Sequence, residues 1–252
     1  MLQGKVGFVT GASKGMGTHF VREMVALGAR VACAARPSAE LDALAAEFGD
    51  KVLLVPCDAS DRAQVFSAVE KTAAHFGRLD YMVANAAIFA PFDFETGSEE
   101  LIRRHVDLNL LGAAWCMQAA IPHLKKTSGL IVAISSETVN MPYALLSAYV
   151  ATKAGLEGLC GAVREEMRPH GVRVCVLRSG AVAGGSGHEN WDADMTARFY
   201  ETSIRTGRYA FTGQAATPQS MADALTKVLS LPNDISIDTI DVRSSRPPLP
   251  IA

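Results

Sequence analysis

The first 28 residues constrain the fold more than any other part of the sequence. Residues 5–10 (KVGFVT) are apolar and β-branched, as expected of a buried strand. Residues 11–17 (GASKGMG) hold three glycines, and a helical pattern follows them to Gly28. A strand, a glycine-rich turn and a helix in this order are typical of a dinucleotide-binding unit, because the turn lets backbone approach a pyrophosphate at a helix amino terminus. An ordinary turn is the alternative.

The same alternation of strands and helices continues along the chain. We expect further strands at residues 30–35, 52–56, 79–84, 130–134 and 172–177, and a last strand at 235–242. We expect helices at residues 61–76, 99–124, 147–167 and 218–231. There is no repeat, low-complexity segment or linker between them. The sequence therefore predicts one α/β domain over residues 1–252, with a Rossmann-like, doubly wound parallel sheet of about seven strands flanked by helices.

Composition excludes several other classes of protein. The net charge is −2 and there is no basic block, so we expect neither a nucleic-acid partner nor a membrane partner. No signal-peptide pattern opens the chain, and no apolar run approaches the roughly 20 residues of a spanning helix. The five cysteines form no Cys-x-x-Cys pair, which indicates a cytoplasmic location, and the six histidines lack ligand spacing, so we expect no bound metal.

A second motif lies behind the strand at residues 130–134. Ser136 follows that strand, where open α/β sheets bind their ligands. Tyr149 and Lys153 are four residues apart in the next helix and therefore share one face. We expect the lysine ammonium to lower the tyrosine pKa from about 10, so that the phenol exchanges protons with a carbonyl or hydroxyl oxygen. A Tyr-x-x-x-Lys pair alone arises by chance, so its place behind a strand carries the argument.

The residue after the second strand bears on the choice of dinucleotide. Ala35 stands where an NAD enzyme would place an acid for the ribose hydroxyls, and Arg36 follows it. A guanidinium there can pair with a 2′-phosphate, and Lys14 adds positive charge, so we expect NADP(H) rather than NAD(H). A solvated loop arginine is the alternative. The residues expected to contact the cofactor are Gly11, Ser13, Lys14, Gly15, Met16, Gly17, Arg36, Asp58, Ala59, Asn85, Ala86, Tyr149, Lys153, Gly180 and Val182.

The alternating pattern breaks between residues 179 and 211. A loop this long inside a compact domain is usually functional, so we expect a mobile lid with short helices over the substrate. The expected walls of the substrate pocket are Ile88, Phe89, Tyr143, Leu146, Trp191 and Phe199, which favours an apolar or ring-bearing substrate. Glu137 could bind a polar group of the substrate, but we expect it to face solvent. Asn109, a poor helix former, could break the backbone ladder of its helix, hold a water or lie on the surface.

With these residues identified, the sequence resembles the short-chain dehydrogenase/reductase family over nearly its whole length. Thr10-Gly11-x-x-x-Gly15-x-Gly17 is similar to the cofactor loop of the family, Asp58 to its adenine contact and Asn85-Ala86 to the start of its Asn-Ala-Gly motif. Asn109, Ser136, Tyr149 and Lys153 match its catalytic tetrad. The chain departs from the pattern at Ala87, at Ser179 in place of proline, and at Gly184 in place of a threonine for which Ser186 could substitute.

The resemblance implies a role for each residue of the tetrad. Tyr149 is the acid/base, Ser136 polarises the carbonyl, and Lys153 binds the nicotinamide ribose and lowers the tyrosine pKa. Asn109 holds a water that leads to the lysine. The family also implies a homo-oligomer, usually a tetramer formed through the helices that carry Asn109 and Tyr149, although a dimer stays open.

The sequence as a whole predicts an NADPH-dependent reductase of a small-molecule ketone or carbonyl, which also oxidises secondary alcohols. The alternative is an NADP(H)-binding scaffold or sensor with little catalysis, which the three departures would support.

Overall fold

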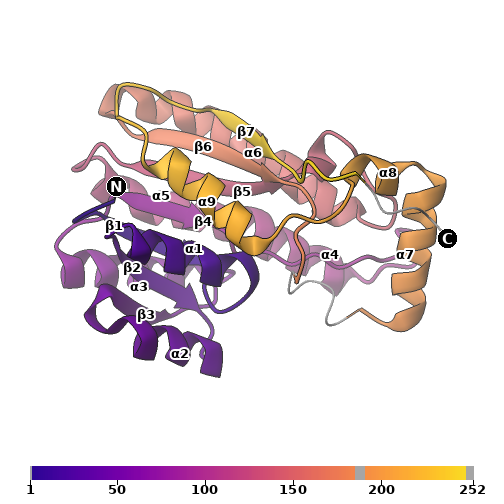
Figure 1. Cartoon of the computed structure of the whole chain (residues 1–252), viewed down its shortest axis with the longest axis horizontal. Coiled ribbons are helices and arrows are strands. Elements are labelled where there is room, and N and C mark those ends of the chain that lie inside the picture. Colours follow the sequence, from indigo (N-terminus) through magenta and orange to yellow (C-terminus); the bar gives the residue numbers. More distant parts are fainter. Residues whose placement is uncertain (1, 185–190, 248–252) are drawn as a thin grey trace.

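The computed structural model describes residues 2–184 and 191–247, built around one parallel sheet (Figure 1). The sheet has seven strands in the order β3-β2-β1-β4-β5-β6-β7. The strands are β1 (Val6–Thr10), β2 (Arg30–Ala35), β3 (Val52–Pro56), β4 (Tyr81–Ala84), β5 (Leu130–Ser136), β6 (Arg173–Ser179) and β7 (Thr239–Val242). All neighbouring strands pair in parallel, so their carboxyl ends share one edge of the sheet.

Helices cover both faces of the sheet (Figure 1). The α-helices are α1 (Gly15–Ala26), α2 (Ala39–Phe48), α3 (Arg62–Phe76), α4 (Glu99–His105), α5 (Ala113–Leu124), α6 (Ser147–Met167), α7 (Ala193–Arg205), α8 (Arg208–Thr212) and α9 (Pro218–Leu229). Short 3₁₀ turns are η1 (Gly49–Lys51), η3 (Glu137–Val139) and η4 (Arg168–His170), and η2 (Val106–Gly112) is π-helical. In this part of the chain no helix is long and apolar enough to cross a membrane.

The hydrophobic core consists of two layers, one on each side of the sheet. Residues of α1, α2 and α9 pack with Val9 of β1 in the first layer. Residues of α3, α5 and α6 pack with Phe8 of the same strand in the second. Successive strand residues point to opposite faces, so strands that are covered on both sides must be apolar throughout. The predicted doubly wound, single-domain α/β fold is confirmed.

The strand order reverses at β1, which separates the two halves of the sheet. From β1 the chain moves through β2 to β3 on one side and through β4 to β7 on the other. Ligands of open α/β sheets bind at this kind of switch point, beyond the carboxyl ends of the strands. Strands β5 and β6 extend two residues further than predicted, because Ser135 pairs with Arg178 and Ser136 with Ser179. Ser136 is therefore the last residue of β5, whereas the sequence placed it just past the end of the strand.

The single helix predicted for residues 99–124 is interrupted. It consists of α4, a π-helical segment at η2 and α5, and Asn109 lies in the π-helical part. The first alternative for Asn109, a break in the backbone ladder, is the one observed. Gly112 ends the segment where a Cβ atom would lie 2.6 Å from the Ala59 carbonyl oxygen, so α5 approaches the end of β3 closely. Short π-helical segments of this kind are frequent at functional sites.

An ion pair between α6 and β6 leads to the first prediction, a loss of stability. Glu157 of α6 accepts from Arg178 Nη2 at 2.7 Å and from Ser135 Oγ at 2.6 Å. We expect Glu157→Ala to lower the free energy of unfolding by about 2 kcal/mol, because it leaves Arg178 with the longer 3.4 Å ion pair to Asp241 and removes the acceptor of the Ser135 hydroxyl. Chemical denaturation measures this. Glu99→Gln is the control, since the exposed Glu99–Arg103 pair contributes under ~0.5 kcal/mol. Equal losses in the two variants would contradict the prediction.

Candidate active site

The glycine-rich turn between β1 and α1 has a backbone that only glycine accommodates. Gly11 and Gly15 have φ angles of +65° and +57°, in the left-handed region. A Cβ atom on Gly17 would lie 2.0 Å from the Gly11 carbonyl oxygen. The first turn of α1 therefore packs directly on the backbone of the loop, and its amino terminus is open to an anion. This close-packed cradle fits the pyrophosphate of a dinucleotide.

Asn85 connects the end of β4 to the end of β1. Its Nδ2 donates to the Thr10 carbonyl oxygen at 2.9 Å, and its backbone N–H donates to Thr10 Oγ1 at 3.0 Å. Ala86 N–H donates to the same hydroxyl at 3.0 Å. Thr10 and Asn85 thus lock the two central strands together beside the glycine-rich turn. Ala87, the departure from the Asn-Ala-Gly pattern, is exposed.

The next two strands bring Arg36 and Asp58 to the same edge of the sheet. Arg36 is exposed directly after β2, whereas Ala35 is buried. Asp58 Oδ1 accepts from Ser60 Oγ at 2.7 Å and from Ser60 N–H at 2.9 Å. These hydrogen bonds lower the pKa of Asp58, and the charge of Arg36 makes a smaller contribution in the same direction. The carboxylate is therefore fixed and charged near an exposed guanidinium.

The remaining predicted cofactor contacts lie in the same region. Lys14 is exposed in the turn and Ser13 is partly buried. Met16 Sδ lies 3.8 Å from Ser179 Oγ, which places the turn beside the end of β6. Gly180 N–H donates to the Val242 carbonyl oxygen at 2.9 Å, and Val182 forms a parallel bridge with Ala216. Gly184 is exposed, and Ser186 lies outside the described residues, as do residues 185–190 of the predicted lid.

Ser136, Tyr149 and Lys153 come together at the end of β5 and the start of α6. Lys153 Nζ is buried, donates to the Ile134 carbonyl oxygen at 2.7 Å and lies 5.7 Å from the centroid of the Tyr149 ring. Ser136 Oγ accepts from Thr138 Oγ1 at 3.0 Å, and its own proton can reach another oxygen. One helix and one strand end therefore present a phenol, an ammonium and a hydroxyl together.

The pKa values of these groups differ from the sequence-based expectation. Burial raises the pKa of Tyr149 to about 12, and a hydrogen bond with Ser136 only partly opposes it. Burial also lowers the pKa of Lys153 to about 8. The pKa of Tyr149 is therefore raised where the sequence predicted it to be lowered, because desolvation outweighs the hydrogen bond with Ser136.

Asn109 anchors the loop that follows β4. Its Oδ1 accepts from Ile88 N–H at 2.8 Å, and its Nδ2 donates to the Ile88 carbonyl oxygen at 2.9 Å. A longer hydrogen bond of 3.3 Å runs from Asn109 Nδ2 to Thr152 Oγ1 in α6. The side chain thus joins the π-helical segment to the loop before Phe89. A water between Asn109 and Lys153 stays a prediction.

Aromatic side chains gather over Tyr149. Phe89 meets the Tyr149 ring edge-on at 4.9 Å between centroids, and Trp191 Nε1 donates to the Phe89 carbonyl oxygen at 2.9 Å. Phe199 lies 5.2 Å from Trp191 and 6.0 Å from Tyr143, measured between ring centroids. Four of the six predicted pocket residues therefore form one cluster. Of the other two, Ile88 is adjacent to it and partly buried, whereas Leu146 is fully buried at the residue before α6.

The expectation that Glu137 faces solvent is wrong. Glu137 is only 6 % exposed, because η3 turns inward after Ser136 and α8 covers the Glu137 side chain. Glu137 Oε1 accepts from Thr212 Oγ1 of α8 at 2.7 Å, and Thr212 Oγ1 also contacts the Tyr143 hydroxyl. Sequence reasoning missed Thr212 entirely. It is 75 residues away along the chain, and no local pattern signals such a contact.

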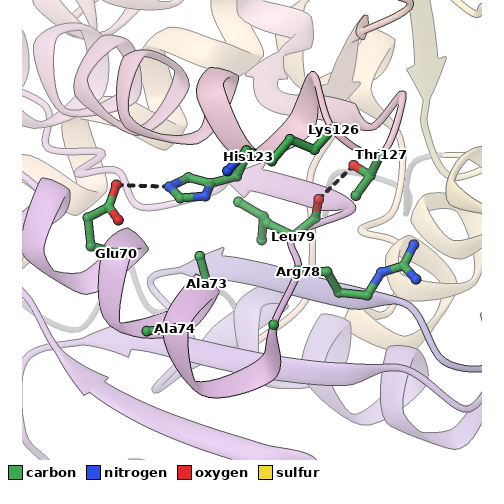
Figure 2. A pocket seen from close by; sticks show the side chains of 9 residues that line it. Glu70, Ala73, Ala74, Arg78, Leu79, His123, Lys126 and Thr127 are labelled. Atoms are coloured by element: carbon green, nitrogen blue, oxygen red, sulfur yellow. Dashed lines mark hydrogen bonds and ion pairs between the residues drawn. The ribbon is translucent and has the colours of Figure 1, made fainter.

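A hollow of about 500 Å³ lies between α3 and α5, away from the residues described so far (Figure 2). Its lining includes His123, which pairs with Glu70 at 2.9 Å, and Thr127, whose hydroxyl donates to the Leu79 carbonyl oxygen at 2.7 Å. Leu79 and Thr127 precede β4 and β5, so the hollow is at the amino ends of the strands. It is therefore separate from the cluster around Tyr149.

Comparison with known proteins assigns the family. The model of the short chain dehydrogenase family matches residues 5–194. The chain belongs to the short-chain dehydrogenase family. The predicted resemblance is confirmed, and the family is one of oxidoreductases that act on alcohols and carbonyls.

Individual relatives agree with this assignment. The chain is 34 % identical over 184 residues to 11-beta-hydroxysteroid dehydrogenase-like 3 of Arabidopsis thaliana, an alignment that covers 71 % of the chain and 59 % of that relative. Among solved structures, 3-ketoacyl-(acyl-carrier-protein) reductase from Brucella melitensis, complexed with NADH, has a TM-score of 0.85 at 28 % identity, covering 98 % and 99 % of the two chains. Alcohol dehydrogenase from Thermococcus sibiricus, complexed with 5-hydroxy-NADP, has a TM-score of 0.83 at 27 % identity with the same coverage.

Proposed function

We propose that this dehydrogenase uses NADP(H) to reduce a ketone or other carbonyl compound, and oxidises a secondary alcohol in the reverse direction. The observation that supports this best is the convergence of Ser136, Tyr149 and Lys153 at the carboxyl edge of the sheet, beside the glycine-rich turn. A phenol, a hydroxyl and an ammonium at the sheet switch point are the groups that carbonyl reduction requires.

The cofactor would lie along the carboxyl ends of β1 to β6. The cradle of Gly11, Gly15 and Gly17 would hold the pyrophosphate, Asp58 the adenine, and Arg36 with Lys14 the 2′-phosphate. When bound, the nicotinamide supplies the hydride chemistry that no side chain can perform. Lys153 would bind the nicotinamide ribose through its ammonium, which also donates to the Ile134 carbonyl oxygen.

Tyr149 would exchange the proton. With its pKa raised to about 12, the phenol is protonated near neutral pH and is ready to donate to a carbonyl oxygen. Ser136 would donate a second hydrogen bond to the same oxygen and fix its position. In the oxidative direction the phenolate must form first, and the charge of Lys153 would support it.

The aromatic cluster supports an apolar or ring-bearing substrate body. Phe89, Tyr143, Trp191 and Phe199 surround the approach to Tyr149, and two of them come from the segment we propose as a lid, residues 179–211. Helix α7 carries Phe199 and α8 carries Thr212, so movement of these helices would open the site. We also propose a cytoplasmic homo-oligomer, a tetramer or a dimer, formed through the helices that carry Asn109 and Tyr149.

A substrate panel tests the proposed function. Ketones and secondary alcohols, acyclic and cyclic, are mixed with each nicotinamide cofactor, and nicotinamide absorbance is followed. We expect NADPH oxidation with ketones and NADP⁺ reduction with the matching alcohols. Tight NADPH binding without turnover of any compound would favour the scaffold or sensor instead.

Arg36 gives the second prediction, on cofactor preference. We expect the wild-type protein to bind NADPH more tightly than NADH, and Arg36→Ala to reduce that preference by about 10- to 100-fold, the effect of a hydrogen bond to a charged group. Fluorescence titration with both cofactors measures it. Arg168→Ala is the control, because Arg168 is exposed beyond the far end of α6. Tighter binding of NADH to the wild-type protein would overturn the preference.

The pKa values give the third prediction, on pH dependence. Alcohol oxidation needs the phenolate of Tyr149, whose pKa of about 12 leaves it scarce at neutral pH. The oxidation rate should therefore rise by about tenfold per pH unit from pH 6. It should flatten above about pH 8, where Lys153 loses its charge. Carbonyl reduction should change little below pH 8, since the phenol stays protonated. An oxidation rate that is flat from pH 6 to 8 would contradict this.

A further inference from the structure

Glu137 carries a buried carboxylate oxygen without a partner. Oε1 accepts the hydroxyl proton of Thr212 at 2.7 Å. Across residues 2–184 and 191–247, Oε2 has no hydrogen-bond partner of regular geometry, and the Ala181 backbone interacts with the carboxylate only weakly, although the residue is only 6 % exposed. Burying a carboxylate oxygen without a hydrogen-bond donor lowers the stability of the folded protein, so this unpaired oxygen needs an explanation.

The position of Glu137 connects it to the reacting groups. It follows Ser136 directly in the chain, and its partner Thr212 also contacts the hydroxyl of Tyr143, whose ring stacks on Phe199. Desolvation chiefly raises the pKa of Tyr149, and the charge of Glu137 adds a smaller contribution in the same direction. The aromatic cluster around Phe89 and Phe199 lines the apolar side of the same site. Glu137 therefore places an unpaired hydrogen-bond acceptor next to Ser136 in the chain and close to this cluster.

The surroundings of Glu137 favour a neutral donor. Desolvation raises its pKa, and the hydrogen bond from Thr212, the charge of Arg243 and the backbone of Ala181 oppose this more weakly. Asp241 acts in the same direction as desolvation. A substrate ammonium bound at Oε2 would also meet the positive charge of Arg243. A hydroxyl satisfies the acceptor without that repulsion.

We propose that Glu137 determines specificity by accepting, at Oε2, a hydrogen bond from a second hydroxyl next to the reacting carbon of the substrate. The substrates are then hydroxyketones with an apolar or ring-bearing body and, in reverse, the corresponding vicinal diols. A diol and NADP⁺ give the hydroxyketone, NADPH and one proton. This inference rests on the proposed function, whose substrate class it narrows.

Matched substrate pairs test it. The wild-type protein is assayed with 1,2-cyclohexanediol against cyclohexanol, and with 2-hydroxycyclohexanone and acetoin against cyclohexanone and butanone. We expect kcat/KM to favour the hydroxylated member by about 10- to 100-fold, as for a hydrogen bond to a charged group. Glu137→Leu should bring this ratio close to one. If the leucine variant does not fold, Glu137→Ala is measured in its place and should likewise bring the ratio close to one.

Thr212→Val separates substrate recognition from attachment of α8. It removes the hydroxyl that bonds Oε1 and leaves Oε2 in place, so it should alter both members of a pair alike and keep their ratio. If Glu137 only fastens α8, then Glu137→Leu will keep the ratio too, and the inference fails. It fails equally if the wild-type ratio is near one. Turnover of none of these compounds would instead overturn the proposed function, and this inference with it.

Discussion

Tyr149→Phe is expected to lower kcat by about 100- to 10,000-fold, the usual contribution of a positioned proton donor. The substitution removes one hydroxyl and keeps the ring that packs edge-on against Phe89. NADPH affinity should change by only a few-fold, because the cradle of the glycine-rich turn is untouched. Turnover is measured by nicotinamide absorbance, and binding is measured by fluorescence.

Tyr143→Phe is the matched control for this prediction. Tyr143 belongs to the same aromatic cluster, but its hydroxyl contacts Thr212 Oγ1 and the Arg208 carbonyl oxygen. Its loss should cost far less activity than the loss of the Tyr149 hydroxyl. Equal effects of the two substitutions, or unchanged turnover in Tyr149→Phe, would remove the phenol from the proposed chemistry.

Gly17→Ala is expected to weaken binding of NADPH by about 10- to 100-fold, as overpacking against rigid backbone typically costs 1–3 kcal/mol. The added Cβ atom would lie 2.0 Å from the Gly11 carbonyl oxygen. Backbone cannot rotate away as a flexible side chain can, so the turn must change its shape. Fluorescence titration at a temperature well below the unfolding midpoint measures the affinity.

Gly158→Ala is the control for the glycine prediction. Gly158 lies within α6, and a Cβ atom there would meet nothing within 4 Å. Its replacement should leave NADPH affinity unchanged and could raise stability by up to about 1 kcal/mol through helix propensity. If Gly17→Ala binds NADPH as well as Gly158→Ala does, the turn is not the pyrophosphate site.

The sequence predicted the fold because each strand and its neighbouring helix carry their own signals. Apolar runs such as residues 130–134 had to be buried on both faces, and the glycines at 11, 15 and 17 marked the first turn. The π-helical segment around Asn109 could not be predicted in this way. It ends at Gly112, whose close approach to Ala59 joins two residues far apart in sequence.

The candidate site was predicted less completely, for an electrostatic reason. The spacing of Ser136, Tyr149 and Lys153 placed them together, but spacing does not give the degree of burial. Burial raises the pKa of Tyr149, whereas the sequence predicted a lower one. Glu137 is buried, whereas the sequence predicted that it faces solvent. The contact between Glu137 and Thr212 depends on how α8 folds back over η3, which no local pattern encodes.

A crystal structure with NADP⁺ and a substrate alcohol tests the central claim most directly. The account predicts the alcohol oxygen within about 3 Å of both Tyr149 Oη and Ser136 Oγ, the reach of a hydrogen bond, with the reacting carbon facing the nicotinamide. A nicotinamide bound away from Tyr149, with no movement of residues 191–212 able to join the two, would contradict it.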